Sequence, residues 1–209
     1  MVSCSEEQET ALRPQDAKST PMTFLVSHPG QATRATETSF EQNDRIGLYV
    51  ADAKAQLEIG GNLVNNEALT YDGSKWAAAR TLYWDKGTYT AYAYYPYMED
   101  VSSITDQPFS VVLDQSTAKS KETLGGYEAS DLLFASSKNI SASASPIPLN
   151  FKHIMSKLKI RLVKGEDFDG DMPTTAQVTI HNTVPTATID LLTSPFAFSI
   201  APFCHEEYG

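Results

Sequence analysis

The run Thr88-Tyr-Thr-Ala-Tyr-Ala-Tyr-Tyr95 decides the fold class of this chain. Aromatic residues and threonine suit the pleated surface of a β-sheet, and the run contains little else apart from alanine. Lys86-Gly87 precedes it as a turn, and Pro96 ends it. Because its tyrosines fall on both alternating faces, we expect a central strand that is covered on both sides.

The segments on either side of this run repeat with a period of two rather than 3.6. Asp72-Gly73 lies between two apolar runs, which predicts a β-hairpin because both residues tolerate a positive φ. Seven strands are expected between residues 22 and 163, at spacings typical of an antiparallel β-sandwich. They are 22–27, 45–50, 67–71, 75–77, 88–95, 109–113 and 154–163, with a short apolar segment at 131–135.

Residues 154–163 have the clearest alternation, with Ile154, Leu158, Ile160 and Leu162 on one face. Lys157, Lys159 and Arg161 lie on the other, which predicts a half-buried strand with a basic, solvated face. This face is either a surface for an acidic partner or a solvated strand face on which lysine prevents aggregation. We favour the second interpretation.

The acidic segment 165–171 divides the chain. Its carboxylates could bind calcium, but their spacing does not fit the twelve-residue calcium loop, so we interpret the segment as a linker and predict no metal site. Strand-like runs at 177–180 and 187–191 then begin a new set. The expected organisation is a tether (1–21), an N-terminal β-sandwich domain (22–165), an acidic linker (166–173) and an incomplete second β-sandwich domain (174–209).

Composition excludes several classes of protein. The 209 residues carry 16 Lys and Arg against 26 Asp and Glu, a net charge of −10, which argues against a nucleic-acid partner. Cys4 and Cys204 lie at opposite ends of the chain, so a disulfide framework is not expected. No run of about 18 apolar residues is present to span a membrane as a helix.

Sequence motifs of catalysis are missing. The chain has no His-Glu-x-x-His, no Gly-x-Gly-x-x-Gly, no phosphate-binding P-loop and no Gly-x-Ser-x-Gly. We therefore predict that the protein is not an enzyme, has no catalytic residue and binds no cofactor. A site of paired carboxylates, brought together only by folding, is the least favoured alternative. Tyr92, Tyr94, Tyr95 and Tyr97 form either a platform for sugars or, more commonly, a core strand and its rim.

Both ends of the sequence suggest truncation. Met1-Val-Ser-Cys4 resembles the end of a bacterial lipobox, which implies lipidation of Cys4, although an incidental cysteine is the alternative. A polar tether without apolar periodicity follows at 5–21. Because the apolar segment 196–203 leads into no further element, we expect that residue 209 is not the natural end and that the true start lies before Met1.

Seven features in this order resemble the fimbrillin family of Bacteroides-type lipoprotein pilins, over roughly residues 1–195. After the lipobox and tether they are Thr33-Arg-Ala-Thr36 with Arg45-Ile-Gly-Leu-Tyr49, Tyr71-Asp-Gly-Ser-Lys-Trp76, Tyr92-Ala-Tyr-Tyr-Pro96, Asp131-Leu-Leu-Phe-Ala135 and Leu149-Asn-Phe-Lys-His-Ile-Met-Ser-Lys-Leu158. The resemblance implies two transthyretin-like β-sandwich domains in tandem. This chain would contain the first domain and the opening strands of the second.

The same resemblance implies assembly into a pilus. Such pilins pass through the periplasm as lipoproteins to the outer membrane, and a trypsin-like protease cuts them after an arginine. The cut frees the first strand, here represented by Met22, Phe24 and Val26, and a strand of the next subunit fills the groove. Arg34 is the expected cleavage site, with Arg45 as the alternative, although some members, such as anchors and tips, are not cut.

The expected partners are therefore other pilin subunits, the outer membrane through the lipid on Cys4, and a host surface protein or glycan. The expected location is a fimbrium on the cell surface. The alternative function is that of a monomeric surface lipoprotein that binds glycans or host ligands.

Overall fold

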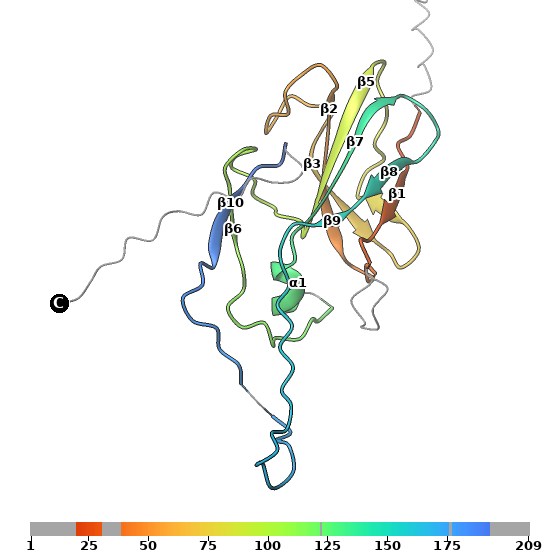
Figure 1. The fold of residues 1–209 in the computed structure, drawn as a ribbon. Coiled ribbons are helices and arrows are strands. Elements are labelled where there is room, and N and C mark those ends of the chain that lie inside the picture. Colours follow the sequence, from red (N-terminus) through yellow and green to blue (C-terminus); the bar gives the residue numbers. More distant parts are fainter. Residues whose placement is uncertain (1–19, 31–38, 122, 176, 193–209) are drawn as a thin grey trace, which may run out of the picture.

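The computed structural model describes residues 20–30, 39–121, 123–175 and 177–192. Its elements are almost all strands, which confirms the predicted all-β class (Figure 1). They are β1 (Phe24–Ser27), β2 (Arg45–Asp52), β3 (Val64–Tyr71), β4 (Trp76–Ala78), β5 (Thr88–Tyr95), β6 (Gln107–Ser110), α1 (Gly126–Ser130), β7 (Leu133–Ser141), β8 (Ile147–Asn150), β9 (Lys152–His153) and β10 (Thr186–Ile189). Within the described ranges, no helix has the length and apolar character needed to cross a membrane.

A six-stranded antiparallel sheet in the order β4-β3-β2-β5-β7-β9 forms the centre of the fold. β5 lies between β2 and β7, with Tyr92 opposite Tyr49 on one side and Ser136 on the other. The tyrosine-rich run is therefore a central strand, as its composition predicted.

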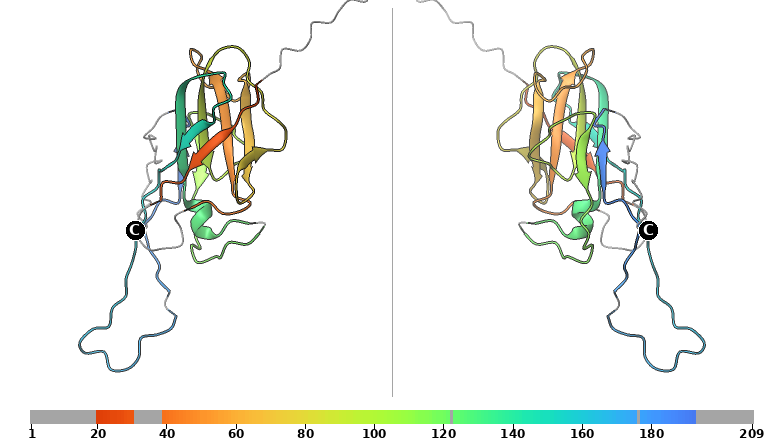
Figure 2. Two further views of the ribbon diagram at one scale, coloured as in Figure 1. Left: turned by 90° about the vertical axis from the view of Figure 1, so that its right-hand side faces the viewer. Right: turned by 90° about the vertical axis from the view of Figure 1, so that its left-hand side faces the viewer.

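Two smaller pairs of strands cover the two faces of this sheet. β1 pairs with β8 in parallel orientation, and β10 pairs with β6 in antiparallel orientation. Figure 2 shows β1 (red) crossing one face and β10 (blue) lying on the other. The result is a β-sandwich in which the central sheet is buried on both sides.

The alternation of side chains along β2 divides the interior into two cores. Ile46, Leu48 and Val50 point to the face beneath β1 and β8, whereas Tyr49 and Ala51 point to the face beneath β6 and β10. Each of these five side chains is at most 1% exposed. Because successive residues of β2 point to two buried faces in turn, its sequence is apolar at almost every position.

The predicted β3–β4 hairpin is present. Gly73 has φ +99°, and the Asp72 carboxylate accepts hydrogen bonds from the backbone N–H groups of Ser74 (2.8 Å) and Lys75 (2.9 Å). The hydrogen bonds to Lys75 and Ser74 lower the pKa of Asp72. Aspartate and glycine therefore have separate functions in this turn, since one caps backbone donors and the other permits the positive φ.

Gly47 is a position where a side chain would not fit. It lies opposite Tyr94, and a Cβ atom at Gly47 would stand 2.3 Å from the Tyr94 ring. We expect Gly47→Ala to lower the free energy of unfolding by about 1–3 kcal/mol through overpacking. Urea denaturation would measure this. Gly60→Ala, where nothing lies within 4 Å of the added atom, should change stability far less, and equal effects would contradict the packing argument.

The prediction of a strand at 154–163 is wrong. Its residues form no ladder, and Leu158, Ile160 and Leu162 are 68%, 47% and 52% exposed. Figure 1 shows the chain leaving the sheet after β9 and returning only at β10. Alternation makes a segment amphipathic, but a strand also needs a partner with a free edge, and none of the described strands lies beside this segment. The half-buried character predicted for it is limited to Ile154 and Met155, which pack against the core beneath β6 and β10.

The region after 165 gives a mixed outcome. Residues 177–180 are not a strand, whereas the run predicted at 187–191 largely coincides with β10. β10 pairs with β6, with Thr186 opposite Ser110 and Ile189 opposite Gln107. The proposed boundary at 166–173 and a second domain from residue 174 stay predictions.

Candidate assembly site at the first strand

β1 is joined to the rest of the fold by the backbone of β8. Phe24 lies opposite Ile147, and Ser27 lies opposite Asn150. The Ile147 N–H donates to the Thr23 carbonyl (2.8 Å), the Phe151 N–H donates to the Ser27 carbonyl (3.1 Å), and the Ser27 hydroxyl donates to Asn150 Oδ1 (2.7 Å). β8 is the strand partner of β1 in the part of the chain that is described.

The residues just before β1 are fixed by a second contact. The Met22 N–H donates to the Leu82 carbonyl (2.8 Å), and the Trp84 N–H donates to the Thr20 carbonyl (2.9 Å). The segment 20–27 is therefore bound first to the loop that precedes β5 and then to β8.

The side chains of this segment separate into an inner and an outer set. Met22 is buried, and Phe24 and Val26 are half-buried against the core beneath β1 and β8, which we call the first core. Leu25, in contrast, is 64% exposed. Met22, Phe24 and Val26, which represent the first strand in the sequence analysis, thus share one face. Ile147 and Leu149, which belong to the same core, are at most 1% exposed, so loss of the segment would expose apolar surface and unpaired backbone groups together.

Aromatic contacts bring the two ends of the following loop together. His28 lies directly after β1, and its ring centre is 4.8 Å from that of Phe40 and 5.8 Å from that of His153. Phe40 in turn contacts Trp76 edge-on at 5.0 Å, inside the first core. Burial, and then the nearby His153, lower the pKa of His28. Sequence reasoning missed this contact because it joins residues on either side of a polar loop.

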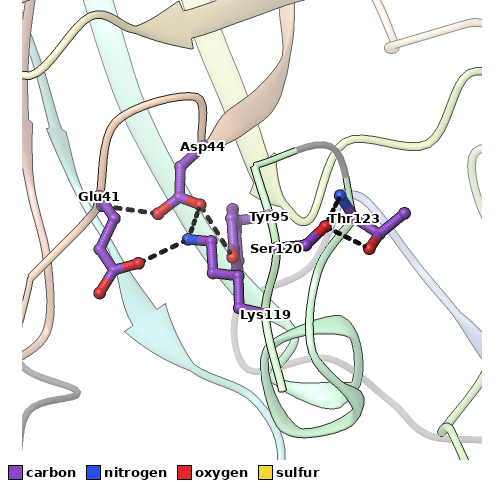
Figure 3. Close-up of polar contacts among 6 residues, drawn as sticks. All are labelled: Glu41, Asp44, Tyr95, Lys119, Ser120 and Thr123. Atoms are coloured by element: carbon purple, nitrogen blue, oxygen red, sulfur yellow. Dashed lines mark hydrogen bonds and ion pairs between the residues drawn. The ribbon is translucent and has the colours of Figure 1, made fainter. Parts of the chain in front are cut away.

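A buried ion pair fixes the turn that follows the loop (Figure 3). Asp44 is 3% exposed, and its Oδ1 accepts hydrogen bonds from Lys119 Nζ (2.6 Å) and from the Tyr95 hydroxyl (3.5 Å). Its Oδ2 accepts from the Glu41 N–H (2.8 Å), and Lys119 Nζ also lies 3.1 Å from Glu41 Oε2. We call these four residues the Asp44 clamp.

The clamp keeps Lys119 charged. Partial burial acts to lower its pKa, but the hydrogen bonds and charges of Asp44 and Glu41 outweigh burial and raise the pKa above its ordinary value. The clamp therefore joins the start of β2 to the loop before α1 through a charged Lys119. No signal in the sequence pointed to it, since Lys119 stands 75 residues from Asp44 in a stretch that predicts only a polar loop.

The other predicted site residues are placed differently. Cys4 and Arg34 lie outside the described residues, as does Cys204. Arg45 is the first residue of β2, its backbone is paired opposite Thr70, and its guanidinium carbon lies 4.4 Å from the centre of the Tyr97 ring. Across the described ranges, no group of three or more His, Cys, Asp or Glu side chains is arranged to hold a metal ion.

The tyrosines of the alternative sugar platform do not form one surface. Tyr94 and Tyr95 are 1% and 5% exposed and belong to opposite cores, and Tyr92 is half-buried. The interpretation as a core strand is confirmed for these residues. Tyr97 alone lies outside β5, beside Arg45.

The chain is similar to several proteins of Bacteroides. It is 28% identical over 151 residues to a Bacteroides ovatus protein provisionally named fimbrium tip subunit Fim1C, covering 66% of this chain and 27% of that protein. The chain thus spans about a quarter of the length of this curated relative.

Solved structures with a limited likeness come from the same genus. One is a fimbrial protein from Bacteroides ovatus (22% identity, TM-score 0.44, covering 65% of this chain and 29% of that one). Another, also from Bacteroides ovatus, is provisionally named a cell adhesion protein (21% identity, TM-score 0.45, covering 65% and 52%).

A family model described as fimbrillin-like matches residues 33–201, well over half of the sequence. The match confirms the resemblance seen in the sequence motifs. It also agrees with the prediction of a structural protein without catalytic activity. The chain belongs to the fimbrillin-like family.

Proposed function

We propose that this protein is a structural subunit of a cell-surface fimbrium and assembles by β-strand addition. The observation that supports this most directly is the way β1 is held. Among the described residues it pairs with β8, it fills the first core with one face, and in the sequence it lies just before the polar segment that contains Arg34. Such a strand can be replaced by another of the same pattern without changing the central sheet.

The exchange follows from the contacts of β1. Proteolysis after Arg34 separates the segment 20–27 from the body, and its departure frees the Ile147 and Phe151 N–H groups and uncovers the core around Leu149. An incoming strand accepts hydrogen bonds from these N–H groups through its backbone carbonyls. It also covers the core if it carries apolar residues at alternate positions, as Met22, Phe24 and Val26 do. The incoming strand comes from another subunit, so assembly and completion of the fold are one event.

Two observations favour Arg34 over Arg45 as the cleavage site. Proteases cut exposed loop segments more readily than strands, and Arg45 belongs to β2. A cut after Arg45 would also separate Glu41 and Asp44 from Tyr95 and Lys119, their partners in the clamp, whereas a cut after Arg34 leaves Phe40, Glu41 and Asp44 attached to the body.

The route to the surface is proposed from the sequence. Lipidation of Cys4 would anchor the chain in the outer membrane after export through the periplasm, and the polar segment 5–21 would serve as its tether. The relative named as a tip subunit and the structure named as a cell adhesion protein support a role at the fimbrial tip or in adhesion as well as in the shaft.

Limited digestion with an arginine-specific protease tests the proposal. We expect an early cut that gives a new N-terminus at Ala35, and fibres in electron micrographs after digestion. Arg34→Ala should prevent both the cut and the fibres, and Arg45→Ala should prevent neither. Early cleavage after Arg45, or digestion that yields cut monomers without polymers at high protein concentration, would argue against a shaft subunit.

A further inference from the structure

A small pocket lies where the start of β2 meets the loop of the Asp44 clamp. Its volume is about 200 Å³, and it is bounded by the turn at 42–45, by Pro96 and Tyr97, and by residues 119–121, 123 and 124. Lys119, Ser120 and Thr123 in Figure 3 lie along this loop, with Asp44 on its inner side. The first strand and its groove form a separate site, so what this pocket binds does not depend on strand addition.

Basic side chains line the pocket, although the protein as a whole is acidic. The chain has a net charge of −10, yet the described charged residues that line the pocket are Arg45, Lys119 and Lys121. Glu41 and Asp44 place two negative charges beside the one positive charge of Lys119, so Arg45 and Lys121 are the basic groups that a ligand would contact. Within the described residues, no carboxylate lies within 4.0 Å of the side-chain nitrogens of Arg45 or Lys121. The pocket therefore attracts an anion.

Arg45 is held in place before any ligand binds. Its guanidinium carbon lies 4.4 Å from the centre of the Tyr97 ring, and the Tyr97 N–H donates to the Arg45 carbonyl (3.0 Å). A guanidinium stacked on an aromatic ring loses little freedom on binding, and its planar donors match the two oxygens of a carboxylate. Lys121 supplies a second, more mobile charge at the same opening.

The rest of the lining is neutral and polar. Gln42 and Asn43 contribute amides, and Thr123 contributes a hydroxyl that also bonds Ser120 (2.8 Å). Asn43 has φ +75°, and its N–H donates to the Tyr71 carbonyl (2.8 Å), so the turn is fixed. Amides and hydroxyls can both donate and accept, which suits the hydroxyl groups of a sugar ring.

The size of the pocket favours a sugar over a peptide. Peptides are usually recognised along a sheet edge or in a groove that accepts several residues. This pocket is bounded by a turn and two loops and is smaller than the roughly 300–1,000 Å³ typical of drug-sized ligands. We propose that it binds a terminal sugar that carries a carboxylate, with Arg45 and Lys121 on the carboxylate and the neutral side chains on the ring hydroxyls.

Titration of the full chain with 3′-sialyllactose, lactose and lactose 3′-sulfate, followed by isothermal calorimetry or NMR, tests this site. We expect weak binding of sialyllactose that decreases with added salt, and no binding of lactose. Arg45→Gln and Lys121→Gln should each weaken binding about tenfold or more, as expected for a lost charge-assisted hydrogen bond. Lys54→Gln, which changes an exposed lysine just after β2, should leave binding unchanged.

Melting temperatures of the variants show whether each one is folded. Arg45→Lys separates charge from geometry, because it keeps the charge but loses the planar pair of donors, and it should bind more weakly than the parent. Equal binding of lactose, no binding of any sugar, or binding unaffected by both pocket variants would overturn the proposal. Equal binding of the sulfate ester would overturn the choice of a carboxylate, and tighter binding of a short glutamate-containing peptide would assign the pocket to a protein partner.

Discussion

A variant that lacks residues 20–27 is expected to lose most of the stability of the fold, and the same residues added as a peptide are expected to restore it. Burying one large apolar side chain contributes about 1.5–3 kcal/mol, so Met22, Phe24 and Val26 together contribute about 5 kcal/mol. Single domains have only about 5–15 kcal/mol in total. Urea denaturation, with and without the peptide, measures both effects.

The alternation of the first strand supplies matched controls for this experiment. A peptide with Phe24→Asp and Val26→Asp should fail to restore stability, because both side chains face the first core. A peptide with Leu25→Asp should restore it nearly as well as the parent, because Leu25 is 64% exposed. If the two altered peptides behave alike, or if the deletion leaves the unfolding midpoint unchanged, then β1 is not an exchangeable part of the core.

Breaking the Asp44 clamp is the second change with a large expected effect. Lys119→Met leaves the Asp44 carboxylate, whose side chain is 4% exposed, without its cation. Removing one partner of a buried ion pair typically costs about 3–5 kcal/mol, since the other charge stays buried and uncompensated. We expect a loss of that size in chemical denaturation. Lys119→Met/Asp44→Asn should recover part of it, because the carboxylate charge is then gone.

The Arg80–Glu67 pair is the matched control for the clamp. Its ions lie 2.9 Å apart, but the Arg80 side chain is 66% exposed. Exposed pairs contribute about 0–1 kcal/mol, so Arg80→Met should have a small effect. If Lys119→Met has an effect as small as that of Arg80→Met, then water reaches Asp44 and the clamp does not fix the start of β2.

The parts of the fold that could be predicted from sequence are those set by neighbouring residues. β5 and the Asp72-Gly73 hairpin follow from local composition and turn chemistry, and both are present. The segment 154–163 has an equally clear pattern but no ladder, because pairing depends on an edge that is distant in sequence. Local alternation therefore predicts which face of a segment is apolar, but not whether another strand covers it.

In the candidate site, too, local features could be predicted from the sequence and long-range contacts could not. Met22, Phe24 and Val26 share a face because period two places them there. The clamp was not foreseen, since Lys119 and Asp44 are 75 residues apart and neither belongs to a recognisable motif. The pocket beside the clamp was not foreseen either, because it depends on the position of Arg45 over the Tyr97 ring and not on a run of basic residues.

The parallel pairing of β1 with β8 also has a consequence for the order of folding. Ser27 and Asn150, which meet at the end of this pair, are 123 residues apart in the chain. Contacts between distant segments form late, because the entropy of closing a long loop must be overcome first. During synthesis, residues 20–27 emerge long before β8, so neighbouring strands of the central sheet can pair while the place of β1 is still vacant. Under the proposed strand addition, a strand of another copy would compete for that vacancy, and the relative rates of closure within one chain and between chains would decide whether monomers or polymers accumulate.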